Sequence, residues 1–137
     1  MRLNPYLVFD GQCQAAFRFY EQCLGGKIAA LMTYGDSPMA EQCGAQSRDR
    51  IMHARLQVGD TVLMGSDAPP DRFQPMQGMS VTLNIEQAAE AERVFHALAE
   101  GGNVIMPIGE TFWAQRFGMM TDRFGTPWMI NCEKPKG

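Results

Sequence analysis

Two stretches of the chain share one pattern of apolar and polar positions. Residues 6–32, YLVFDGQCQAAFRFYEQCLGGKIAALM, lie over residues 82–108, TLNIEQAAEAERVFHALAEGGNVIMPI. The coinciding pairs are Asp10 and Glu86, Phe19 and Phe95, and Gly25–Gly26 and Gly101–Gly102. Each copy has an apolar strand, an acidic turn, an amphipathic helix, a Gly-Gly stop and a second apolar strand. An internal repeat constrains the architecture strongly, so the chain is predicted to contain two copies of one structural module.

The spacing of apolar residues predicts one helix in each copy. Apolar side chains recur every three or four residues, which places them on one helical face. The residues concerned are Ala16, Phe19, Tyr20, Cys23 and Leu24 in the first copy and Ala88, Ala91, Val94, Phe95 and Leu98 in the second. The glycine after each helix supplies the left-handed turn that a Cβ atom would oppose.

A hairpin follows the second strand of each copy. Residues 50–67 are predicted to turn at Gly59–Asp60, and residues 116–132 near Phe124–Gly125. The fold class is therefore α+β, with two βαβββ modules forming a curved eight-stranded mixed sheet.

Two irregular stretches complete this organisation. Residues 35–49 are polar and are expected to form a long mobile loop, and residues 67–78, with three of the eight Pro, are expected to link the halves. The predicted domain is 1–137, with module 1 at about 1–67, a linker at about 68–78 and module 2 at about 79–135. A chain of this length buries roughly two-thirds of its unfolded surface in one domain.

Charge and cysteine content exclude several classes of function. The chain has 12 Lys and Arg against 15 Asp and Glu, so no nucleic-acid partner is expected. No apolar run approaches the ~20 residues of a membrane span, and MRLNPYLVF is too short for a signal peptide, so no membrane partner is expected. The four Cys show no metal-type spacing with His53 or His96 and are expected to be reduced thiols of a cytoplasmic protein.

Four segments carry a resemblance to a known family. FRFYEQCLGGKI, MTYGDSP, RIMHARLQVGDTVLMGSD and ETFWAQRFGMMTDRFGTPWMINC resemble the vicinal oxygen chelate superfamily of glyoxalase I, extradiol dioxygenases and bleomycin-resistance proteins. They look most like its PhnB-like branch, which is also catalogued as a 3-demethylubiquinone-9 3-methyltransferase domain. The resemblance covers nearly the whole chain and implies a ligand-binding groove and a homodimer.

The resemblance also implies where a metal site would lie. Metal-dependent members hold one divalent ion with four His, Gln or Glu side chains from strands of both modules. The corresponding positions here are Pro5, Leu63 or Met64, Ser80 or Thr82, and Met129. Divalent metals of this kind need oxygen or imidazole donors, so neither this metal site nor a cofactor is expected. His53, with Arg55 on the same strand face, is the alternative metal ligand, although a lone strand His is more often a structural hydrogen-bonding group.

The predicted function is therefore metal-independent binding of a small molecule. Aromatic rings and adaptable Met side chains would line the groove, although most Met residues are expected to pack the core. Arg116 would anchor an anionic group, or pair with an acid such as Asp122, and Trp128 would lie in the core or the cleft. The candidate ligand-binding residues are Tyr34, His53, Arg55, Met64, Ser66, Trp113, Arg116, Trp128 and Met129.

Two other functions stay open at this stage. One is an enzyme, either a metal-free catalyst or a lyase, isomerase or dioxygenase whose metal has moved to His53 and nearby acids; its catalytic residues are unknown. The other is a protein that mainly associates with a partner. Methyl transfer is not expected, because the strand-to-helix turns FDGQCQ and NIEQAA lack the Gly-rich pattern of a nucleotide-type cofactor site.

Overall fold

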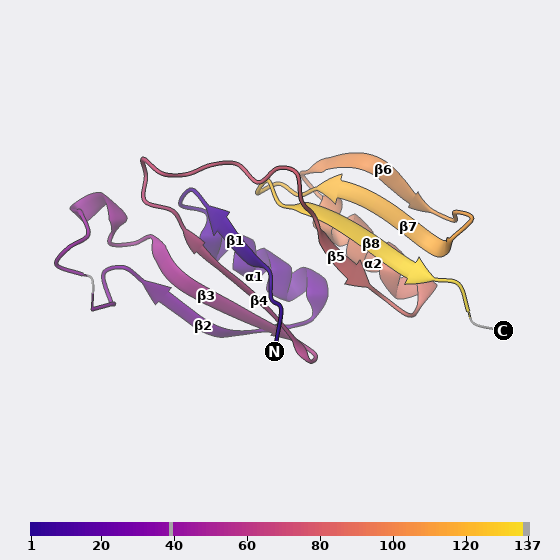
Figure 1. Cartoon of the computed structure of the whole chain (residues 1–137), viewed down its shortest axis with the longest axis horizontal. Coiled ribbons are helices and arrows are strands. Elements are labelled where there is room, and N and C mark those ends of the chain that lie inside the picture. The colour runs from indigo at the N-terminus through magenta and orange to yellow at the C-terminus, as the bar shows by residue number, and fades with distance from the viewer. Residues whose placement is uncertain (39, 136–137) are drawn as a thin grey trace. The chain divides into compact units, whose positions relative to one another are not determined.

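Each half of the chain folds into a βαβββ module, as predicted (Figure 1). The structure is a computed structural model that describes residues 1–38 and 40–135; Met39 of the predicted loop and residues 136–137 lie outside the described residues. Module 1 contains β1 (Tyr6–Phe9), α1 (Cys13–Leu24), β2 (Lys27–Thr33), β3 (Ile51–Val58) and β4 (Thr61–Asp67). Module 2 contains β5 (Val81–Asn84), α2 (Ala88–Ala99), β6 (Asn103–Gly109), β7 (Ala114–Thr121) and β8 (Pro127–Glu133).

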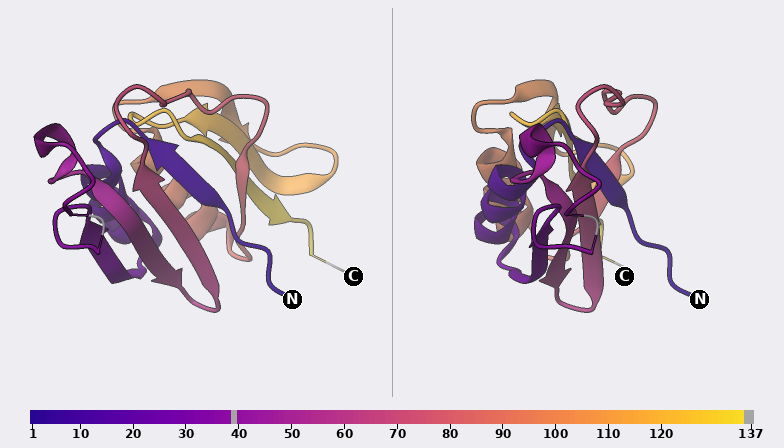
Figure 2. Two further views of the ribbon diagram at one scale, coloured as in Figure 1. Left: turned by 60° about the vertical axis from the view of Figure 1, so that its left-hand side comes forward. Right: turned by 90° about the vertical axis from the view of Figure 1, so that its left-hand side faces the viewer.

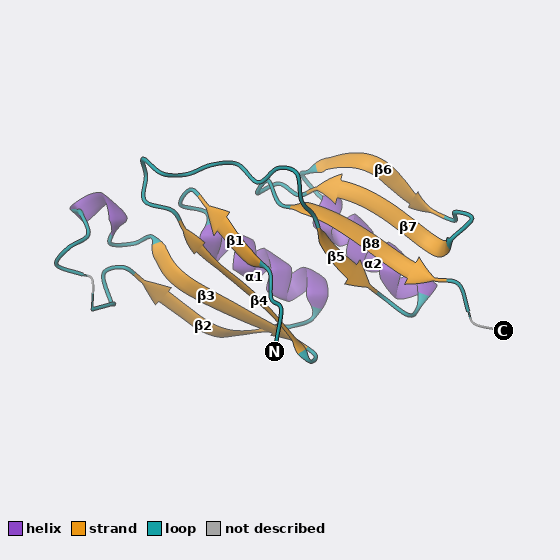
Figure 3. Cartoon of the chain, in the orientation of Figure 1, coloured by secondary structure: helices purple, strands orange, loops and turns teal. Residues whose placement is uncertain are grey.

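The two modules are separate compact units, Met1–Pro75 and Met76–Gly137. The division falls inside the predicted linker, which forms no helix or strand between β4 and β5 (Figure 3). The predicted loop at residues 35–49 contains one short 3-10 helix, η1 (Ala45–Ser47).

The eight strands form two four-stranded mixed sheets, ordered β1-β4-β3-β2 and β5-β8-β7-β6. In each sheet the first strand runs parallel to the last strand of its module, and the other neighbours are antiparallel. The predicted strands are thus all present, but hydrogen bonds join them as two sheets and not as one eight-stranded sheet. One helix packs on one face of each sheet (Figure 2).

The helices bury the same pattern of side chains in both modules. The shared buried positions are Cys13, Ala16, Phe17 and Tyr20 in α1 and Ala91, Val94, Phe95 and Leu98 in α2, and α1 also buries Cys23. A Cβ atom on Gly65 would lie 2.8 Å from the Phe17 ring, and one on Gly118 would lie 2.6 Å from the Phe95 ring. The counterpart of Phe95 is therefore Phe17, and the alignment of Phe95 with Phe19 is wrong. The spacing between ring and stop differs in the two copies, because the Gly-Gly pair follows Phe17 by eight residues and Phe95 by six.

The Gly-Gly stops perform the same task in both modules. Gly25 and Gly101 have φ values of 72° and 76°, the left-handed conformation that was predicted after each helix. A Cβ atom on Gly26 would lie 2.5 Å from the Gln57 carbonyl oxygen, and one on Gly102 would lie 2.4 Å from that of Thr121. The second glycine of each pair thus lets the chain pass close to the hairpin strand.

Both predicted hairpin turns are confirmed. Gly59 has φ 57°, and Val58 pairs with Thr61 across the turn. In module 2 the Gly125 amide donates to the Asp122 carbonyl oxygen at 3.0 Å.

Candidate functional site

The module 2 sheet has one face against α2 and one face without a helix. Side chains alternate along a strand, so neighbouring residues point to opposite faces. In β8 the buried residues Trp128, Ile130 and Cys132 alternate with half-buried Pro127 and Met129. Pro127 and Met129 therefore face away from the helix.

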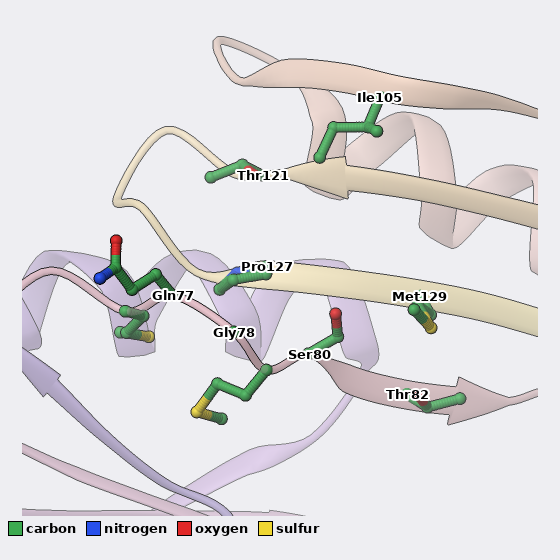
Figure 4. A pocket seen from close by; sticks show the side chains of 10 residues that line it. Gln77, Gly78, Ser80, Thr82, Ile105, Thr121, Pro127 and Met129 are labelled. Atoms are coloured by element: carbon green, nitrogen blue, oxygen red, sulfur yellow. The ribbon is translucent and has the colours of Figure 1, made fainter.

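A pocket of about 640 Å³ lies on this open face of module 2 (Figure 4). Its floor includes two cross-strand pairs, Thr82 with Met129 and Thr121 with Pro127. The ten lining residues are Met76, Gln77, Gly78, Met79, Ser80, Thr82, Ile105, Thr121, Pro127 and Met129. Three thioethers, three hydroxyls and one amide therefore face the pocket, and none of these ten described residues is ionisable.

The positions that correspond to metal ligands do not fit a divalent ion. In module 2, Ser80, Thr82 and Met129 line the pocket with hydroxyl and thioether groups. In module 1, Leu63 is buried and its neighbour Met64 is half-buried, so alternation leaves Met64 as the residue on the open face. Hard divalent ions prefer carboxylate oxygens and borderline ones also take imidazole nitrogen, and this set has neither group. Within residues 1–38 and 40–135, no three His, Cys, Asp or Glu side chains lie close enough to hold a metal ion together.

The candidate residues of module 2 have different environments. Met129 lines the pocket, whereas Trp113 is 48% exposed and packs edge-on against Phe112 and Phe117. The Arg116 Nε–H donates to Glu92 of α2 at 2.9 Å, so Arg116 pairs with an acid, but with Glu92 and not with Asp122.

Trp128 belongs to the core of module 2. Its side chain is 1% exposed, and its indole N–H donates to the Asp122 carboxylate at 2.8 Å. Of the two environments predicted for this ring, core or cleft, the structure has the core.

The candidate residues of module 1 lie partly together. Arg55 pairs with Met64 across β3 and β4, and alternation places His53 and Ser66 on the same face. The His53 ring stacks on Tyr6 with centroids 5.9 Å apart, and the Tyr6 hydroxyl lies 3.4 Å from His53 Nδ1. Sequence reasoning missed Tyr6, although its place in β1, beside the predicted hairpin strands, was the available signal.

Tyr34 is held at the end of β4. Its hydroxyl donates to the Asp67 carbonyl oxygen at 3.2 Å. Burial raises the pKa of Tyr34, and the negative charge of Asp67 raises it further, against the opposing effect of Arg50. Tyr34 is therefore a neutral hydrogen-bonding group at neutral pH.

A buried carboxylate occupies the N-terminus of α1. Asp67 is 1% exposed, and its Oδ1 accepts the amide N–H groups of Gly11 at 2.8 Å and Cys13 at 3.0 Å. Its Oδ2 accepts the Ile51 amide at 2.8 Å. Desolvation, with the Asp67 charge, strongly raises the pKa of the Cys13 thiol. The anion site that a helix N-terminus offers is thus already filled by the protein itself.

Seven pocket residues were not among the sequence candidates or the metal-equivalent positions: Met76, Gln77, Gly78, Met79, Ile105, Thr121 and Pro127. They come from the linker, β6, β7 and β8, which are distant in sequence. Alternation in β8 with Met129 as reference was a signal for Pro127, and pairing across the hairpin was a signal for Thr121.

No helix in the described part of the chain is long and apolar enough to cross a membrane.

The two βαβββ modules define a protein of the glyoxalase-like fold. The chain superposes on a glyoxylase/bleomycin resistance protein/dioxygenase domain from Frankia with a TM-score of 0.67 over 98% of each chain, at 12% identity, a likeness of fold alone. Residues 1–131 match the family described as 3-demethylubiquinone-9 3-methyltransferase, and the chain belongs to this family. The resemblance drawn from the sequence is confirmed.

Three known proteins are similar to this chain over nearly their full lengths, the third of them in fold alone. The chain is 39% identical to Protein YjdN of Escherichia coli, covering 98% of this chain and 97% of the relative. The structure is similar to that of PA1353 from Pseudomonas aeruginosa, at 51% identity and a TM-score of 0.90, covering 98% and 99% of the two chains. It is also similar to a putative 3-demethylubiquinone-9 3-methyltransferase, PhnB protein, from Bacillus cereus, at 24% identity and a TM-score of 0.80, covering 96% and 99%.

Proposed function

We propose that this chain is a small-molecule binding protein that holds its ligand in the module 2 pocket without a metal ion. One observation carries the proposal: the open pocket has a volume of about 640 Å³, within the range of small-ligand sites, and its walls place polar groups beside apolar ones. Its ligand is unknown. We further propose that the protein acts as a cytoplasmic homodimer.

The chemistry of the walls supports binding in place of metal-assisted catalysis. Met76, Met79 and Met129 supply flexible thioethers, which adapt to irregular apolar surfaces. Thr82 and Thr121 supply hydroxyl groups at fixed strand positions, which can orient a polar group of the ligand.

Two observations weigh against the enzyme readings. The His53 ring contacts the Tyr6 phenol, and within the described residues it belongs to no group of three His, Cys, Asp or Glu side chains that could hold a metal ion. Methyl transfer from a nucleotide-type cofactor would favour an anion site at a helix N-terminus, and at α1 the Asp67 carboxylate already takes those amide groups.

A fluorescence titration tests the proposal. N-phenyl-1-naphthylamine, a neutral dye that brightens in apolar sites, is added to the purified full chain with and without EDTA. We expect saturable binding that EDTA leaves unchanged. Thr82→Phe, which fills the pocket, is expected to weaken binding at least tenfold. Asn84→Phe is the matched control, because Asn84 follows on the same face of β5 outside the pocket lining.

Two results would contradict the proposal. One is dye binding that does not saturate, or that Thr82→Phe and Asn84→Phe weaken equally. The other is binding that EDTA abolishes and added divalent metal restores, which would revive the metal-dependent alternative.

A further inference from the structure

The sheet that carries the pocket is almost free of charge. Among the residues of β5, β6, β7 and β8, Arg116 and Glu133 alone are charged, although charged residues make up 20% of the chain. In module 1 the corresponding open face carries His53 and Arg55. The helix-free faces of the two sheets have the same strand arrangement, but they differ in the charge of their side chains.

Three charged side chains of module 2 that lie near pocket residues in sequence have partners outside the pocket lining. Arg116 donates to Glu92 of α2, on the helix side of the sheet. Asp122 is 4% exposed and accepts the Trp128 indole N–H in the core. Arg123 donates to the Glu100 carbonyl oxygen at 3.1 Å. The partners described for these three side chains all lie outside the pocket lining.

The remaining charge lies at the far end of the sheet. Glu133 is the last residue of β8, four positions beyond Met129, which corresponds to about 13 Å at the rise of a β-strand. Interactions between exposed charges over more than about 8 Å are largely screened at physiological ionic strength. Glu133 therefore contributes little to the potential inside the pocket.

The lining groups can stabilise dipoles but not charges. The hydroxyls of Ser80, Thr82 and Thr121 and the amide of Gln77 both donate and accept hydrogen bonds. A charged group that binds in this open pocket gives up part of its hydration and meets no opposite charge among the ten lining residues, which is unfavourable. Carbonyl, hydroxyl and amide groups of a neutral molecule lose much less.

We propose that the pocket selects electrically neutral molecules that combine a flat apolar ring system with hydrogen-bonding groups, and rejects their charged analogues. This inference rests on the proposed function and names the class of its ligand. The thioethers of Met76, Met79 and Met129 favour aromatic rings, because sulfur makes favourable contacts with their edges.

Two dyes with one skeleton test this selection. N-phenyl-1-naphthylamine is neutral, and 1-anilinonaphthalene-8-sulfonate is the same molecule with an added sulfonate. We expect the neutral dye to bind the full chain at least tenfold more tightly at 0.15 M salt. In Thr82→Lys an ammonium group enters the pocket, and the preference for the neutral dye is expected to fall at least tenfold.

The control adds the same charge outside the pocket. Gln115 lies on β7, six residues from Thr121, and Gln115→Lys is expected to leave the ratio of the two affinities within twofold. If circular dichroism shows that Thr82→Lys does not fold, Thr121→Lys introduces the same charge into the pocket from β7.

The outcomes separate this inference from the proposed function. Affinities within threefold of each other in the unmodified protein would overturn neutral selection and leave binding in the pocket intact. A ratio that changes equally in Thr82→Lys and Gln115→Lys would also overturn it, because selection would then lie elsewhere. Failure of both dyes to saturate would overturn the proposed function and the selection with it.

Discussion

Replacement of Asp122 by Ala is expected to destabilise module 2 by about 3 kcal/mol. Hydrogen bonds that the structure describes reach the Asp122 carboxylate from the Phe124 amide at 2.8 Å, the Thr126 amide at 3.1 Å and the Trp128 indole at 2.8 Å. The side chain is 4% exposed, so water cannot fully replace it.

The magnitude follows from the donors that lose their acceptor. A buried donor left without a partner costs about 1–3 kcal/mol. Thr126 and Trp128 are 0% and 1% exposed, whereas Phe124 is half-buried and water can partly satisfy its amide. Two full penalties and one reduced penalty give the total of about 3 kcal/mol.

Urea unfolding followed by tryptophan fluorescence measures this loss. Both Trp residues, Trp113 and Trp128, belong to module 2, so the signal reports on this module. With a slope of about 2 kcal/mol per molar urea, the midpoint is expected to fall by about 1.5 M. Asp122→Asn keeps the volume and one acceptor oxygen and should lose less, and Asp71→Ala in the exposed linker should change stability by under about 0.5 kcal/mol. A loss below about 0.5 kcal/mol in Asp122→Ala would refute the reasoning.

Two further predictions concern a glycine and the thiols. Gly102→Ala should destabilise the protein by about 1–3 kcal/mol in urea unfolding, because its Cβ would lie 2.4 Å from the Thr121 carbonyl oxygen. Gly44→Ala, with open space around the new Cβ, should be close to neutral. Equal unfolding midpoints for the two variants would contradict this prediction. Iodoacetamide at pH 8 should label half-buried Cys43 before Cys13, because burial raises the Cys13 pKa and keeps its thiol protonated. Peptide mass spectrometry measures the two labelling rates. If Cys13 of the native protein is labelled as fast as in urea, the predicted protection by burial is wrong.

The elements of the fold could be predicted because their signals are local. Apolar spacing of three and four residues identifies a helix wherever it packs, and Gly59–Asp60 and Phe124–Gly125 signal turns by their own conformational preferences. The residue-by-residue alignment of the two helices was predicted less accurately. Gly25 and Gly101 align correctly, but Phe17 replaces Phe19 as the partner of Phe95, because contact with Gly65 and Gly118 sets the helix register.

The site was predicted less well for a physical reason. Met129 was identified through the resemblance, but the pocket needs Gln77 from the linker, Ile105 from β6 and Thr121 from β7, which only tertiary contacts bring together. Arg116 was expected to bind an anion or pair with Asp122, and its partner Glu92 lies on a helix 24 residues earlier. Side-chain partners at such separations leave no signal in one sequence.

The amino-acid sequence by itself determined that this protein consists of two βαβββ modules, and it placed no carboxylate or imidazole at Pro5, Met64 and Met129, where the resemblance implied metal ligands. The tertiary structure decided which face of each strand is covered. Alternation tells which residues of β8 lie together, but only the packing of α2 on the sheet places Trp128 in the core and Met129 in the pocket. The physical reason is that side chains alternate equally on the two faces of a strand. The position of the helix therefore decides which set of side chains is buried in the core and which set can contact a ligand.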